Sequence, residues 1–225
     1  MNKFKGFGGR DYHHTRIHHP AVKFSLQSRI RAVSDAILEF FPGGVEKLLD
    51  IGTADGLFAR GIKEAIPKIQ KVYGLDIQND QLVYNPFFSA QGSCTQMPFG
   101  DDTFDLITAA ALIEHLPEPG PFLMECHRVL KPGGGLFLTC PAPFFEWMAT
   151  KLGYLKHAGH LARYDLSDIK RLCENAGFNV VLLKRFMITP INIPGHVYLE
   201  SFFQTIGSSF LMLNQVVGSI KSNHK

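Results

Sequence analysis

A short string of acidic and glycine residues ends an apolar strand pattern at 45–51. It reads Asp50, Ile51, Gly52, Thr53, Ala54, Asp55, Gly56, and a helical pattern follows it. Strand, turn and helix in this order open a βαβ unit. Ligands of open parallel sheets bind beyond the carboxyl ends of the strands, so we expect this loop to contact one. Gly52 permits the tight turn, and Gly56 permits a close approach of backbone to the ligand.

The residue types in this loop favour a cationic ligand. A dinucleotide loop has the pattern G-x-G-x-x-G, but the residue two positions after Gly52 is Ala54. Asp50 and Asp55 would repel a diphosphate, and no G-K-[ST] string of a phosphate-binding loop follows the turn. Two carboxylates suit the ammonium and sulfonium groups of S-adenosylmethionine. The loop therefore favours this methyl donor over NAD, and an NAD-dependent oxidoreductase is the disfavoured alternative.

A further acid stands at the end of the next strand pattern, 71–76. Asp76 lies 20 positions after Gly56. An acidic side chain at this place can accept hydrogen bonds from both hydroxyls of a ribose. The loop and Asp76 together predict a site for a nucleoside.

The elements that must position these residues alternate along the chain. Helical spacing of apolar residues occurs in 25–41, 58–66, 121–130 and 167–176, with Pro121 at a first helical position and Gly177 as a cap. Strand patterns occur in 45–51, 71–76, 104–110, 135–140 and 178–183. This alternation predicts an α/β fold with a doubly wound, mostly parallel sheet and helices on both faces.

The apolar segment 197–220 is interrupted by polar residues, which argues against a membrane span. We expect a helix near 198–206 and a strand near 211–220. The alternative is one long interfacial helix, and the segment is compatible with contact to a membrane surface.

Several ordered motifs carry a resemblance to a known family. Residues 97–105 read M-P-F-G-D-D-T-F-D, which is similar to the family string L-P-F-x-D-x-x-F-D, and residues 112–116 include Glu114 and His115. The helix-closing string at 130–134 and the ending at 175–178 also match. Over 45–178 the chain resembles the class I S-adenosylmethionine-dependent methyltransferases, especially the small-molecule subgroup that includes quinone-biosynthesis enzymes.

This resemblance implies a Rossmann-like, seven-stranded methyltransferase fold and a set of cofactor contacts. Asp50 and the Gly52–Gly56 backbone would hold the methionine portion, Asp76 the ribose, and Ile77 would pack on the adenine. The family often has an acid after the third strand, where this chain has Ser93, whose hydroxyl can still accept a hydrogen bond. The expected cofactor-binding residues are Asp50, Gly52, Thr53, Ala54, Asp55, Gly56, Asp76, Ile77, Ser93, Cys94 and Ala110.

The acceptor side offers two histidines. Methyl transfer needs alignment and exclusion of water, and a general base only where the acceptor must lose a proton. His115 and His160 are the candidates for that base, and a structural hydrogen-bonding role is the alternative for each. The aromatic stretch 141–148 either shapes an acceptor pocket or covers the core. It favours a small-molecule acceptor that is hydrophobic or lipid-linked.

We divide the chain into an N-terminal lid segment and helix, 1–44, and a cofactor-binding domain, 45–225. The lid segment contains His14 and His18 at helical i, i+4 spacing, which is one arrangement that can chelate a metal. A solvated or lid-forming role is favoured instead, because methyl transfer requires no metal and no further ligands complete the site. We therefore expect no metal.

Composition narrows the remaining classes. The formal net charge of +3 is too small and too dispersed for a nucleic-acid binder. Four cysteines without close spacing suit reduced thiols, and the polar first ten residues lack a secretory signal pattern, so we expect a cytoplasmic protein. The main alternative to an enzyme is a catalytically silent relative that acts as a binding or activating partner.

Overall fold

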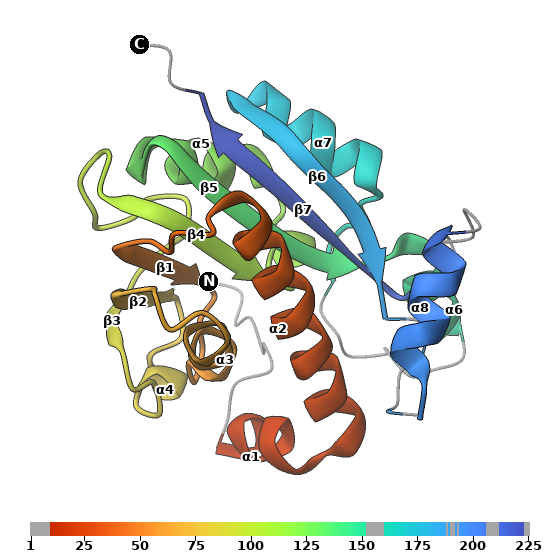
Figure 1. The fold of residues 1–225 in the computed structure, drawn as a ribbon. Coiled ribbons are helices and arrows are strands. Elements are labelled where there is room, and N and C mark those ends of the chain that lie inside the picture. Colours follow the sequence, from red (N-terminus) through yellow and green to blue (C-terminus); the bar gives the residue numbers. More distant parts are fainter. Residues whose placement is uncertain are drawn as a thin grey trace.

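In a computed structural model, the described part of the chain forms a seven-stranded sheet in the order β3-β2-β1-β4-β5-β7-β6 (Figure 1). The structure describes residues 10–151, 160–187, 189, 192, 194–205 and 212–222. The strands are β1 Lys47–Ile51, β2 Lys71–Asp76, β3 Phe88–Gln91, β4 Phe104–Ala110, β5 Leu130–Pro141, β6 Phe178–Phe186 and β7 Asn214–Lys221. Neighbours from β3 to β5 pair in parallel, whereas β7 is antiparallel to β5 and β6. The predicted mostly parallel sheet is confirmed.

Helices cover both faces of this sheet (Figure 1). The helices are α1 Arg10–His18, α2 Pro20–Phe40, α3 Leu57–Ala65, α4 Asn79–Leu82, the 3-10 helix η1 Ile113–His115, α5 Pro119–Val129, α6 Pro143–Lys151, α7 Leu166–Asn175 and α8 His196–Thr205. Apolar side chains of α2 and α3 pack into one buried cluster with the sheet, and those of α5 and α7 pack into another. Because both faces are covered, the central strands are buried on both sides and are rich in apolar residues.

Two helices begin earlier than their apolar spacing predicts. Helix α2 begins at Pro20 rather than at residue 25, and α5 begins at Pro119, so Pro121 is not its first residue. In both cases a proline occupies the first turn. Backbone N–H groups there have no partner within the helix, so the N–H that proline lacks is not needed. The extended backbone of Glu118 supplies the helix boundary before α5.

Two strands and one helix have boundaries set by their partners. Strand β6 continues past the predicted residue 183 to Phe186 because it pairs with β7 along its length. Strand β5 begins at Leu130, where it pairs with Phe104 before a register shift. Helix α7 begins at a capping box, in which the Asp165 side chain accepts from the backbone N–H of Asp168.

The apolar segment 197–220 splits as predicted into α8 and β7. The alternative of one long helix is wrong, because β7 is buried between β5 and β6 (Figure 1). This half of the segment therefore has no surface to offer a membrane. Among the described residues, no helix combines the length and hydropathy that crossing a bilayer needs.

No residue range was predicted for strand β3 or for helices α1, α4 and α6. Strand β3 is four residues long and only partly buried, so it lacks a continuous apolar run. Helix α1 has Ile17 as its one aliphatic residue, so it lacks the apolar spacing on which the prediction of helices depends. Residues 1–9 of the predicted lid segment lie outside the described residues.

Candidate active site

The turn after β1 has the backbone that its glycines require. Gly52 has φ +70° and Gly56 has φ +73°, values that favour glycine. A Cβ atom on Gly56 would lie 2.6 Å from the side-chain oxygen of Asn85. Ala54 also has a positive φ, +47°, although it carries a side chain. Such strained backbone is typical of functional turns.

Asp76 holds this turn at the tip of β2. Its Oδ2 accepts the backbone N–H of Ala54 at 2.8 Å, and its Oδ1 accepts that of Gln78 at 2.9 Å. Burial raises the pKa of Asp76, and these hydrogen bonds oppose that rise. Each carboxylate oxygen retains a lone pair for a ribose hydroxyl. The next residue, Ile77, is 68% exposed and offers an apolar surface beside it.

The Asp50 side chain of β1 lies against the neighbouring strand β4. It is buried, and the Thr108 hydroxyl of β4 donates to its Oδ1 at 2.7 Å. Burial raises the pKa of Asp50 to about 6, although hydrogen bonds from Thr108 and Thr53 lower it in part. Asp50 therefore supports the turn from beneath and is not fully ionised near pH 6.

Asp55 faces helix α1. Its Oδ1 pairs with Arg16 Nη1 at 2.6 Å and its Oδ2 with His13 Nδ1 at 2.8 Å. The His13 ring also stacks on Tyr84, with ring centroids 4.5 Å apart and planes within 2°. The acid that the sequence assigns to a cationic ligand is thus paired within the chain, and it fastens α1 beside the turn.

The segment after β3 lies against the tip of β2. The backbone N–H of Gly92 donates to the Asp76 carbonyl at 2.9 Å. Ser93 Oγ lies 2.8 Å from Thr95 Oγ1, and it accepts the Thr95 backbone N–H at 3.2 Å. Burial raises the pKa of the Cys94 thiol to about 11, so this thiol stays protonated. These residues share one edge with the ends of β1 and β4, where Ala110 lies.

The two candidate catalytic histidines come together. The rings of His115 and His160 have centroids 4.8 Å apart at an interplanar angle of 77°. His115 ends η1, and the segment of His160 is tied to η1 because the N–H groups of Leu161 and Ala162 donate to the Glu114 carbonyl, at 2.8 and 3.3 Å. Residues 45 positions apart in the sequence thus form one cluster beyond β4.

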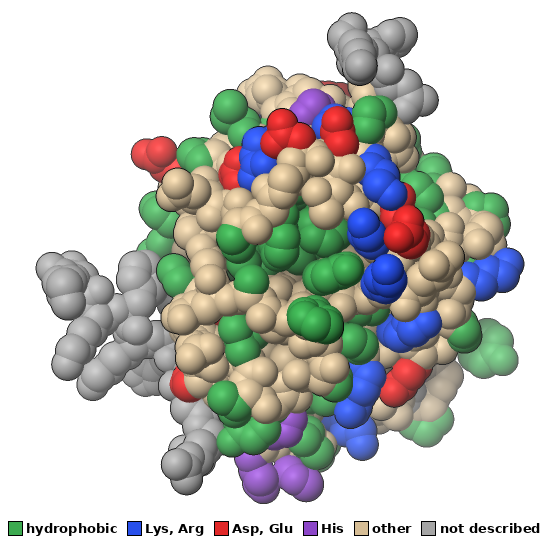
Figure 2. All heavy atoms as spheres, turned by 90° about the vertical axis from the view of Figure 1, so that its left-hand side faces the viewer, with side chains coloured by type: hydrophobic (Ala, Val, Ile, Leu, Met, Phe, Trp, Pro, Cys, Tyr) green, Lys and Arg blue, Asp and Glu red, His purple; other side chains and the backbone are tan. Residues whose placement is uncertain are grey.

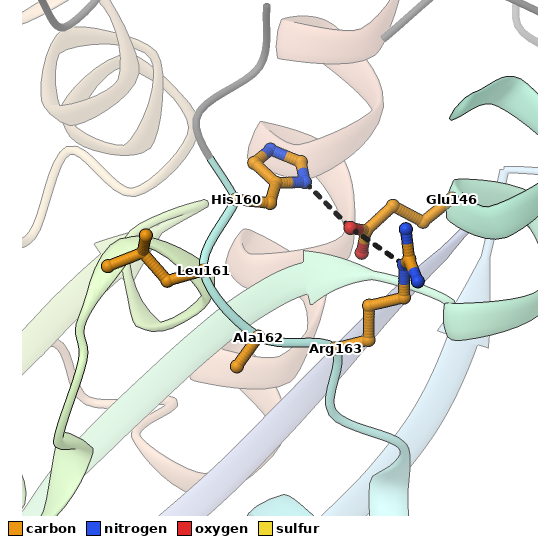
Figure 3. Close-up of a pocket in the computed structure, with 5 residues that line it drawn as sticks. All are labelled: Glu146, His160, Leu161, Ala162 and Arg163. Atoms are coloured by element: carbon orange, nitrogen blue, oxygen red, sulfur yellow. Dashed lines mark hydrogen bonds and ion pairs between the residues drawn. The ribbon is translucent and has the colours of Figure 1, made fainter. Parts of the chain in front are cut away.

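Two buried glutamates adjoin these rings. Glu146 Oε1 of α6 lies 3.0 Å from His160 Nδ1 and 3.2 Å from Arg163 Nε (Figure 3). Glu114 is 1% exposed, and neither of its carboxyl oxygens has a hydrogen-bond partner among the described residues. Burial raises the pKa of Glu114 to about 7. A pocket lined by Glu146, His160, Leu161, Ala162 and Arg163 opens here.

The aromatic stretch 141–148 lies next to this cluster. Phe144 is 55% exposed and Trp147 is 49% exposed, with ring centroids 6.3 Å apart. Pro143 and Phe144 line a second pocket together with Arg163. The side chain of Met148 lies outside the described residues. Exposure of these rings fits a binding surface better than a cover for the core.

Charged side chains are unevenly distributed on the face of the molecule turned toward β3. Figure 2 shows Lys and Arg side chains along one side of that face with acidic side chains among them. Histidine side chains gather at its lower end, where α1 lies. The paired His14 and His18 of α1 are exposed, with ring centroids 4.2 Å apart.

Sequence reasoning missed the partners of the site residues. The contacts of Arg16, Tyr84 and Asn85 with the turn join segments distant in sequence, so no local pattern reveals them. Glu114 lies in a motif that the resemblance quotes, and its adjacency to His115 was the available signal. Glu146 lies within the predicted aromatic stretch as its one acid.

Comparisons with known proteins place the chain among methyltransferase sequences. Residues 26–183 match the model of a family described as a methyltransferase domain. A ubiquinone biosynthesis O-methyltransferase of Azoarcus sp. is 26% identical over 165 residues, which cover 65% of this chain and 70% of that protein. A demethylmenaquinone methyltransferase of Lysinibacillus sphaericus is 36% identical over 98 residues, 39% of this chain and 41% of that protein.

Solved structures share the fold. One from Thermotoga maritima, described as an S-adenosylmethionine-dependent methyltransferase and possible histamine N-methyltransferase, has a TM-score of 0.71 at 18% identity. The similarity covers 94% of this chain and 95% of that one. The sheet, the helices on its faces and the loop at the end of β1 are thus those of a recurrent architecture.

Proposed function

Because the chain belongs to the methyltransferase-domain family, in its class I S-adenosylmethionine-dependent group, we propose that it methylates a hydroxylated aromatic compound of the quinone-precursor type. The observation that carries the proposal is the turn after β1, which Asp76 holds at the carboxyl edge of the sheet. The relatives named above act, by their names, on ubiquinone and menaquinone precursors. The chain spans less than half of the second relative, so the acceptor is inferred from chemistry as well as from names.

The cofactor is proposed to lie across the tips of β1 and β2. Asp76 accepts the two ribose hydroxyls, and the exposed Ile77 side chain covers one face of the adenine. The backbone of 52–56 approaches the methionine portion, which the lack of side chains at Gly52 and Gly56 permits. Asp50 contributes by holding the turn, since its carboxyl is bound to Thr108 within the sheet. Ser93, Cys94 and Ala110 border the same edge.

Helix α1 is proposed to close the cofactor side. Arg16 and His13 attach it to Asp55 directly beside the turn. A cover at this place excludes water from a sulfonium whose charge disperses as the methyl group moves. The lid role predicted for this segment therefore stays our proposal, with a defined attachment point.

The acceptor is proposed to bind beyond β4 and β5. His115 and His160 each offer a ring nitrogen that can accept the hydrogen bond of an acceptor hydroxyl, which orients its oxygen for in-line attack on the methyl carbon. The exposed rings of Phe144 and Trp147 suit a planar aromatic compound with an apolar substituent. An oxygen acceptor is favoured over a carbon one because the polar groups gather at this point.

The protein is proposed to work in the cytoplasm. All four cysteines are free, and three of them are buried. Free thiols suit a reducing compartment.

The test combines cofactor binding with product analysis. We expect calorimetry to show binding of S-adenosylmethionine, and Asp76→Asn to weaken it at least about tenfold, since a hydrogen bond to a charged group contributes about 1.5–3 kcal/mol. Asp35→Asn, at an exposed residue of α2, is the matched control and should bind normally. Thermal unfolding of both variants checks that the fold is retained.

Product analysis uses methyl-labelled cofactor with a catechol carrying a short prenyl chain, the corresponding hydroquinone, and histamine. Label in the hydroxylated aromatic compounds supports the proposal, and label only in histamine contradicts it. Binding without any transfer would identify a catalytically silent partner. No binding of the cofactor would remove the proposal altogether.

A further inference from the structure

Three side chains of the types that bind metal ions in proteins converge beyond the end of β4. Glu114 and His115 belong to η1, and His160 comes from the segment before α7. Each offers one ligand atom, and these three atoms all lie within 4.8 Å of one another. The proposed methyl transfer uses the two imidazoles to orient an acceptor, but it gives no role to the buried Glu114 carboxyl beside them.

We propose that Glu114, His115 and His160 form a binding site for a divalent transition-metal ion. The three ligand atoms lie no more than 4.8 Å apart. A point therefore exists that is within about 2.8 Å of all three, the distance from the centre to a corner of an equilateral triangle with sides of that length. Zinc binds imidazole nitrogen at about 2.0–2.1 Å and carboxylate oxygen at about 2.0–2.2 Å. Side-chain shifts of less than about 1 Å therefore complete the first coordination shell.

The Glu114 carboxyl independently points to a ligand. Glu114 is 1% exposed, and neither of its carboxyl oxygens has a hydrogen-bond partner among the described residues. Buried carboxyl groups are nearly always hydrogen-bonded, paired or bound to a metal. A cation between Glu114 and the two imidazoles would satisfy a group that is otherwise costly to bury.

Glu146 lies beside His160, where a metal-binding imidazole usually has a supporting carboxylate. Such an imidazole turns its second nitrogen to a carboxylate, which fixes the ring. His160 Nδ1 lies 3.0 Å from Oε1 of Glu146, whose side chain is 3% exposed (Figure 3). Arg163 in turn holds the same oxygen at 3.2 Å, so the ring, the acid and the guanidinium form a chain of contacts.

The donor set indicates which ions fit. Two imidazoles and one carboxylate suit Zn²⁺, Co²⁺ and similar borderline ions better than Mg²⁺ or Ca²⁺, which prefer oxygen ligands. Three protein ligands leave a coordination position open, as in catalytic rather than structural zinc sites. Glu114 and Glu146 bring negative charge, which the nearby Arg29 and Arg163 offset in part.

A second histidine pair provides the internal control. His14 and His18 are exposed on α1, with ring centroids 4.2 Å apart. Two imidazoles on an exposed helix face make a weak site compared with a buried three-ligand site. If the metal bound at α1 instead, replacing His14 and His18 would abolish binding, whereas replacing Glu114 would leave it unchanged.

The experiment titrates the chelator-treated full chain with ZnCl₂ by calorimetry and with CoCl₂ by visible absorption. We expect one tight site per chain. Glu114→Gln, His115→Gln and His160→Gln should each weaken Zn²⁺ binding by at least about 100-fold, and Glu146→Gln by about 10–100-fold. The double variant His14→Gln, His18→Gln should retain the tight site. Loss of tight binding in that double variant, or unchanged binding in Glu114→Gln, would overturn the proposal.

A measurement on the unmodified chain guards against variants that fail to fold. X-ray absorption of the Co²⁺-loaded protein should show two imidazole ligands together with oxygen ligands at about 2.0–2.2 Å. A first shell of water oxygens without imidazole would contradict the assignment. Because both readouts report metal binding alone, their result does not depend on whether the proposed methyl transfer is correct.

Discussion

Arg16→Gln tests how helix α1 is fastened beside the turn after β1. The Asp55 side chain is fully buried, and Arg16 and His13 pair with its two oxygens at 2.6 and 2.8 Å. Removing one partner of a buried ion pair costs about 3–5 kcal/mol. His13 and the Leu57 N–H remain to contact Asp55 in the variant, so we take the lower limit, about 3 kcal/mol.

The loss should fall on the attachment of α1 rather than on the whole fold. When α1 lifts away, water can reach Asp55, so local opening relieves the unpaired charge. A change of about 3 kcal/mol corresponds to about a 100-fold shift in the opening equilibrium. Amide hydrogen exchange in residues 10–18 should therefore accelerate about 100-fold, while exchange in β1 and β4 changes little.

Arg171→Gln is the matched control, because Arg171 pairs with Asp168 on the surface, where its side chain is 70% exposed. An exposed pair of this kind contributes about 0–1 kcal/mol, so α1 exchange should be unchanged. As a lid residue, Arg16 should also affect turnover more than the affinity for S-adenosylmethionine. Unaltered exchange in α1 of Arg16→Gln, or equal loss of turnover and affinity, would refute the reasoning.

Three further predictions test the turn, its buried acid and a helix cap. Gly56→Ala should lower the free energy of unfolding by about 1–2 kcal/mol, because Gly56 has φ +73° and its new Cβ would lie 2.6 Å from Asn85. Thermal unfolding measures this loss. Gly43→Ala is the control, because the space around Gly43 is open. Asp50→Asn should gain stability relative to the natural chain as pH rises from 4 to 7. The buried acid has a folded pKa raised from 3.8 to about 6, so its ionisation disfavours the native state above pH 3.8 and does so fully above about pH 6, by about 3 kcal/mol. Urea unfolding across this range measures the difference, and a pH-independent difference would contradict the assignment. Asp165→Ala should lower stability by about 1 kcal/mol through loss of the α7 capping box, whereas an unchanged urea midpoint would show that the cap contributes nothing.

The turn after β1 and the acid at the end of β2 were predictable because their signals are local. Gly52 and Gly56 are read directly from the turn that they permit, and Asp76 from its place at the end of an apolar strand. The mostly parallel sheet follows from the alternation of strands and helices together with the family resemblance, although the order of its strands was not predicted. These features depend on neighbours within a few residues, which the sequence displays.

The partners of these residues depend on tertiary contacts and were not predictable. Asp55 has the residue type that suits a cationic ligand, yet it pairs with Arg16, 39 positions earlier. The Asp50 carboxyl likewise does not face an open site, because it accepts a hydrogen bond from Thr108 of the neighbouring strand. The sequence thus indicated which acids matter, while only the packing of α1 and β4 determines what each one contacts.

The position of β7 has a consequence for how the chain acquires its sheet. Strand β6 touches the rest of the sheet only through β7, which lies between it and β5 (Figure 1). During synthesis, residues 178–186 therefore leave the ribosome before any neighbour exists for their hydrogen bonds, and β5 keeps an open edge until residue 221 has emerged. Unpaired edges invite association with other chains. The interval between these two strands is thus the period in which a nascent molecule most needs protection by chaperones.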